Sequence, residues 1–80
     1  MDELAKSIVK VHEAEIAMVW KFLVNKPIDE KIKKLVRETR LTAVQKNLCI
    51  AHEMAPEYLE ELRQVMADDW NKLFIRYSLN

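Results

Sequence analysis

The sequence predicts an all-α protein that folds as a compact four-helix bundle with two long and two short helices. Three observations support this class: there is no glycine, there is no Asn-Gly pair to close a β-hairpin, and apolar residues recur at helical spacing. The composition, with 50% hydrophobic and 32% charged residues, is typical of a globular chain. We expect one helical domain over residues 1–80.

Residues 2–25 predict the first long helix. Its expected inner face consists of Leu4, Ile8, Val11, Val19, Phe22 and Leu23. Two polar side chains one turn apart, His12 and Glu15, project into this face. After Glu15 the apolar face of the predicted helix widens. Trp20 and Val24 lie on a side of the helix where the residues before Glu15 are charged. This is more apolar surface than one small core usually needs, so we expect something else to cover Trp20.

Residues 27–38 predict a short second helix, because Pro27 follows a loop signal and suits a first helical position. Its narrow apolar stripe consists of Ile28, Ile32, Leu35 and Val36. Its outer face is basic and carries Lys31, Lys33, Lys34 and Arg37, with Arg40 just beyond.

Residues 43–54 predict a separate third helix, because Thr42-Ala43-Val44-Gln45 matches a capping box. The side chains expected to be buried are Leu41, Val44, Leu48 and Ala51.

Residues 56–77 form the longest amphipathic run and predict the last helix, around which the others pack. Pro56 suits its first turn, where a missing N–H costs nothing. The apolar face gathers Tyr58, Leu59, Leu62, Met66, Trp70, Leu73, Phe74 and Tyr77.

The residues available for catalysis are few. Phosphate-binding and dinucleotide-binding loops need glycine, which the chain lacks. Cys49 and His52 are three residues apart and could form a thiol–imidazole pair, but no third group orients them. Together with His12 and Glu15 they could supply four zinc ligands if the two helix faces met. Cys49 faces the polar side, however, and we expect no enzymatic activity, no cofactor and no bound metal.

A basic segment suggests a nucleic-acid contact as an alternative function. Between Lys26 and Lys46 there are seven positive and three negative residues, and the predicted face consists of Lys31, Lys33, Lys34, Arg37 and Arg40. The same face could meet an acidic protein. No aromatic residue interleaves this run to stack on bases, and a helix-turn-helix would present acidic residues from Glu57 onward to the phosphates.

Protein–protein contact is the favoured function. Apolar residues outside the core-facing arcs, which we predict to form the docking surface, are Trp20, Val24, Ile75 and Leu79. We expect a small accessory, regulatory or inhibitory protein, of the size that phages and mobile elements encode, which docks on a larger protein or on a second copy of itself.

The predicted location is the cytoplasm, including that of a host cell. Thirteen basic and thirteen acidic residues cancel, so no net charge draws the chain to an anionic membrane. The single cysteine fits a reducing compartment. The amino terminus does not resemble a signal peptide, and no apolar run is long enough to cross a bilayer.

Overall fold

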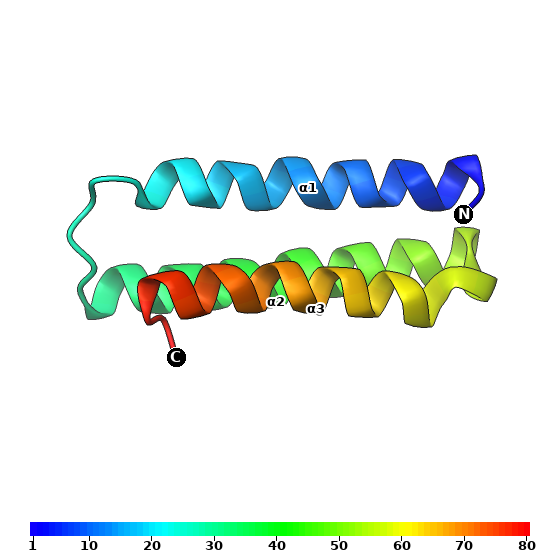
Figure 1. Cartoon of the computed structure of the whole chain (residues 1–80). Helices are drawn as coiled ribbons and strands as arrows, with labels where there is room; N and C mark the ends of the chain where they lie inside the picture. Colours follow the sequence, from blue (N-terminus) through cyan, green and yellow to red (C-terminus); the bar gives the residue numbers. More distant parts are fainter.

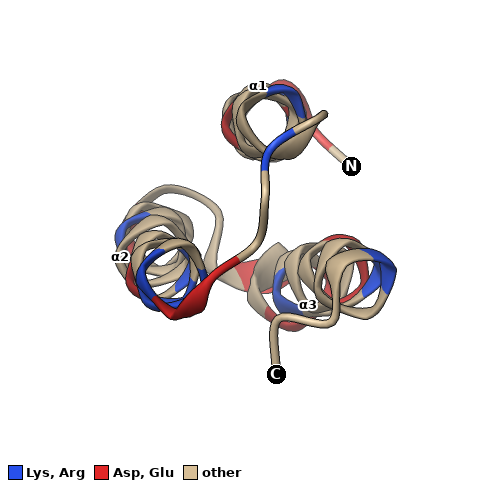
Figure 2. Cartoon of the chain, turned by 90° about the vertical axis from the view of Figure 1, so that its left-hand side faces the viewer, with Lys and Arg blue, Asp and Glu red and all other residues tan.

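The computed structural model describes all residues from 1 to 80 and contains three α-helices and no strand. The helices are α1 (Glu3–Leu23), α2 (Glu30–Met54) and α3 (Leu59–Tyr77), and a short 3₁₀-helix, η1 (Pro56–Tyr58), precedes α3. Consecutive helices run in opposite directions along one long axis (Figure 1). Viewed along that axis they form a triangle in which each helix packs on the other two (Figure 2). The all-helical prediction is confirmed, but the four-helix bundle is wrong.

The error lies in the middle of the chain, where the predicted helices 27–38 and 43–54 are one continuous helix, α2. No glycine or proline between them interrupts the backbone hydrogen-bond ladder. The Thr39 hydroxyl donates to the Leu35 carbonyl at 2.8 Å, so it is satisfied within the helix. Thr42 lies inside α2, where the backbone N–H groups are already paired, and so it is not a helix cap.

The start of α2 also differs from the prediction at Pro27. The Asp29 carboxylate accepts a hydrogen bond from the Ile32 N–H at 2.9 Å and caps the helix. This cap fixes the first turn at Glu30, and Pro27 lies before it in the linker. The linker begins with Asn25, which adopts a left-handed conformation (φ 59°) that asparagine tolerates better than most residues.

Helix α1 matches the predicted range 2–25 to within two residues at each end, but it presents a different face to the core. Its buried residues are Ala5, Ile8, His12, Ile16 and Leu23. Leu4 and Val11, predicted to face inward, are about half exposed because the buried face centres on His12. Burial of His12 is possible because Asp69 on α3 provides a hydrogen-bond partner at 2.8 Å.

The predicted apolar face of residues 56–77 is confirmed across η1 and α3, because its residues are all buried or half-buried. The last turn of α3 ends at Ser78, which is left-handed (φ 52°) and turns the chain back. The Leu79 N–H then donates to the Phe74 carbonyl at 3.0 Å, and the Leu79 side chain is fully buried. Leu79 is thus part of the core and not of an exposed surface.

The core consists of two apolar clusters arranged along the bundle. One contains Ile16, Leu23, Val36, Ala43, Trp70, Leu73, Phe74 and Leu79. The other contains Ala5, Ile8, Ala51, Ala55, Leu62 and Met66. No helix of the three combines the length and apolarity needed to cross a membrane.

Candidate functional site

The four residues predicted as a docking surface do not form one exposed face. Val24 and Ile75 are exposed, and Ile75 is the more open at 74%. Trp20 is half-buried and packs on Tyr77, with the ring centroids 5.4 Å apart. The surplus apolar surface near Trp20 is therefore partly covered by α3, and Leu79 is removed from solvent altogether.

Some side chains of the predicted basic face are exposed to solvent, and others contact neighbouring residues. Lys31 and Lys34 are exposed. The Lys33 ammonium lies 3.7 Å from the carboxylate of Glu30, which is one turn earlier in α2. Arg37 Nη1 donates to the Leu79 carbonyl at 3.1 Å, and the Arg40 guanidinium lies 4.0 Å above the Phe74 ring. Two of the five cations thus hold α2 to α3 and to the residues that follow it.

The residues weighed as zinc ligands have other partners or none nearby. No group of three His, Cys, Asp or Glu residues is placed to hold a metal ion. Cys49 and His52 are both exposed on α2. His12 instead pairs with Asp69, and Glu15 contacts α2 through Lys46 and Asn47.

A polar layer, defined by His12, Glu15, Lys46, Asn47 and Asp69, crosses the bundle between the two apolar clusters. Glu15 accepts hydrogen bonds from the Lys46 ammonium and from the Asn47 amide, the latter at 2.7 Å. Burial alone would raise the pKa of Glu15, but these two hydrogen bonds and the Lys46 charge outweigh it and lower the pKa below its usual 4.5. Each buried polar side chain in this layer has a partner, which is typical of a structural element.

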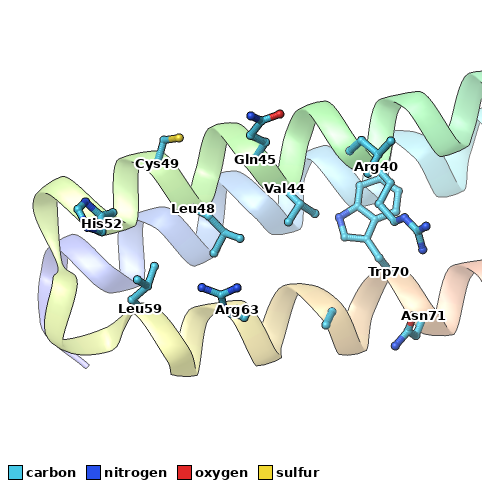
Figure 3. A pocket seen from close by; sticks show the side chains of 12 residues that line it. Arg40, Val44, Gln45, Leu48, Cys49, His52, Leu59, Arg63, Trp70 and Asn71 are labelled. Carbon is cyan, nitrogen blue, oxygen red and sulfur yellow. The ribbon is translucent and has the colours of Figure 1, made fainter.

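An open apolar groove lies between α2 and α3. It has a volume of about 730 Å³, and its walls come from these two helices alone (Figure 3). The lining residues are Arg40, Leu41, Val44, Gln45, Leu48, Cys49, His52, Leu59, Arg63, Ala67, Trp70 and Asn71. The lining contains two arginines and no carboxylate. Its size and its mixture of apolar floor and polar rim are those of a binding site.

Trp70 gives the groove an unusual polar group. The side chain is 1% exposed, and its Nε1–H has no hydrogen-bond partner. Figure 3 shows the indole nitrogen on the side of the ring nearest Val44, and Trp70 is one of the residues that line the groove. A buried N–H without an acceptor is unfavourable, and native structures contain few of them. An acceptor oxygen of a bound molecule would remove this cost.

The groove was not predicted from the sequence, although part of its signal is visible there. Leu41, Val44 and Leu48 recur at helical spacing, and all three were assigned to the core. In the structure Leu41 is 64% exposed, whereas Val44 and Leu48 are half-buried along the groove floor. Had residues 39–43 been treated as helical, Arg40 would have fallen on the same stripe.

Comparison of the chain with protein-family models, curated proteins and solved structures gives no match. The class that the fold defines is a small three-helix protein, and its α2/α3 groove is open and largely apolar.

Proposed function

We propose that the chain is a non-catalytic helical module that acts by protein–protein contact, in an accessory, regulatory or inhibitory role. The observation that supports this proposal is the α2/α3 groove, in which an apolar floor surrounds the unpaired Trp70 N–H. Aromatic and apolar side chains in a concave, partly desolvated surface are the usual centre of a protein interface.

The docking surface we propose therefore differs from the four residues expected from sequence. Its apolar floor is formed by Val44 and Leu48, and the buried Trp70 indole lines it from the core side. Ile75 is exposed and lies outside the residues that line the groove, which makes it a useful reference position.

The test compares two groove variants with one control. Leu41→Asp and Ala67→Glu place charge at exposed groove positions without opening the core, and Ile75→Asp places the same charge elsewhere on α3. Affinity capture from the native cell should recover a protein with the wild type and with Ile75→Asp, and lose it with both groove variants.

Circular dichroism provides the folding control for all three proteins. Equal recovery with every variant would exclude the groove as the docking surface. Loss of the captured protein with Ile75→Asp alone would show that the interface is the surface predicted from the sequence and not the groove.

Nucleic-acid contact through the basic face is the alternative proposal, and the exposed Lys31 and Lys34 are the observation in its favour. Phosphate contacts weaken steeply as salt rises. Under this alternative, Lys31→Glu with Lys34→Glu would abolish a salt-sensitive gel shift that Leu41→Asp leaves intact.

A further inference from the structure

The groove has the proportions of a helix-binding site. Its α2 wall extends from Arg40 to His52 and its α3 wall from Leu59 to Asn71, so each wall covers about 18 Å at 1.5 Å per residue. An added β-strand would need free backbone N–H and C=O groups along a wall. Both walls are helical, and their backbone groups are paired internally. A helix that lies along the groove needs apolar side-chain contacts instead, which Val44 and Leu48 supply.

The charge of the lining selects for an acidic occupant. Arg40 and Arg63 lie on opposite walls, and no carboxylate belongs to the lining. Stacking on Phe74 at 4.0 Å holds the Arg40 guanidinium in place. Arg63 Nε lies 3.3 Å from the Glu60 carboxylate, but both side chains are largely exposed, so this pair is weak and a ligand can compete with it.

The positions of the two arginines also define the distance that must separate two carboxylates of an occupant. Arg63 lies opposite Leu48 in Figure 3, where its guanidinium extends toward α2. Arg40 is eight residues from Leu48 along α2, which corresponds to about 12 Å. On a docked helix, carboxylates about two turns apart would meet both guanidinium groups.

The Trp70 N–H indicates, independently of the arginines, that the occupant carries a hydrogen-bond acceptor. It is a hydrogen-bond donor only, and it is buried without an acceptor between the two arginines. An oxygen acceptor at this point of the docked helix, such as a carboxylate or an amide carbonyl, would satisfy it.

We infer that the groove binds an acidic amphipathic α-helix of a partner protein. The apolar face of this helix lies on Val44 and Leu48, two carboxylates about two turns apart meet Arg40 and Arg63, and an oxygen accepts the Trp70 N–H. This inference rests on the proposed function, because it names the partner of the same groove.

The experiment uses a synthetic helical peptide of about 16 residues with a leucine stripe and two glutamates about eight positions apart, one on each flank of the stripe, because the two arginines lie on opposite walls. A matched peptide carries glutamine at those two positions, and a third has the same composition in scrambled order. Binding is followed in isotope-labelled protein through the indole N–H resonance of Trp70, with that of Trp20 as the internal reference.

We expect the glutamate peptide to shift the Trp70 indole resonance and leave Trp20 nearly unchanged. The glutamine peptide should bind about tenfold more weakly, as expected for loss of charge-assisted hydrogen bonds, and the scrambled peptide should not bind. Arg63→Gln, at an exposed position, should reduce the preference for glutamate over glutamine from about tenfold to about threefold, because Arg40 still meets the other glutamate.

The other results would overturn the inference in distinguishable ways. Equal binding of the glutamate and glutamine peptides would exclude an acidic occupant and leave a helix-binding groove. Absence of any Trp70 shift, with cellular capture still lost in Ala67→Glu, would exclude a helix and preserve the proposed function. A Trp70 shift that grows with protein concentration in the absence of peptide would show that the occupant is a second copy of this chain.

Discussion

The two sides of α2 differ in how their polar groups are satisfied. Toward α1, the polar layer buries Asn47 and pairs it with Glu15, so the contact is complete within the chain. Toward α3, the groove buries the Trp70 indole and leaves its N–H unpaired. A buried polar group that has its hydrogen-bond partner within the chain stabilises the fold. A buried polar group that lacks a partner suggests a site where another molecule binds.

The largest expected contrast is between the same substitution in the apolar core and in the groove. Leu62→Ala removes a side chain with no exposed surface and should lower the free energy of unfolding by about 2–5 kcal/mol. Leu41→Ala, at the exposed rim of the groove, should change it by less than about 0.5 kcal/mol. Urea denaturation followed by circular dichroism measures both values, and similar losses would mean that the groove is part of the core.

A smaller effect is expected from the polar layer. Glu15→Ala leaves the buried Asn47 amide without its acceptor and should destabilise the protein by about 1–3 kcal/mol. Glu13→Ala, at an exposed position of the same helix, is the control and should be nearly neutral. In the Asn47→Leu background the Glu15→Ala cost should shrink, and a double-mutant cycle measures the coupling. Purely additive costs would contradict a direct Glu15–Asn47 interaction.

The smallest effect is a pH dependence that originates in Glu15. Because its pKa is lower in the folded state than the usual 4.5, its contribution to stability is complete above about pH 4.5 and is lost as the pH falls through the folded-state pKa. Melting temperatures recorded between about pH 6 and pH 3 should therefore fall less steeply for Glu15→Gln than for the wild type. Parallel curves would show that Glu15 does not contribute to acid sensitivity.

Helical periodicity was sufficient to predict the fold class and the face of α3. The apolar residues of 56–77 recur without interruption, and the structure buries or half-buries all of them. The boundary between 38 and 43 could not be predicted in the same way. A capping box is a local pattern, and only the unbroken backbone ladder shows that Thr42 lies inside a helix.

The site was less predictable because it depends on contacts between helices. His12 looked like an interruption of the apolar face of α1, and its burial depends on Asp69, 57 residues away. Trp70 looked like an ordinary core residue, and no sequence pattern shows that its N–H lacks an acceptor. Leu79 was placed outside the core-facing arc, but the chain turns back at the left-handed Ser78 and buries it.

The uninterrupted course of α2 links these two regions mechanically. Asn47, which anchors α1, and Leu48, on the groove floor, are adjacent residues of one helix. A molecule that occupies the groove at a hundred times its dissociation constant would raise the free energy of unfolding by about 2.7 kcal/mol. Because the helix is shared, slower amide exchange should extend to its α1-facing residues. In a thermal-shift screen, a ligand of the groove should therefore raise the melting temperature of the entire bundle.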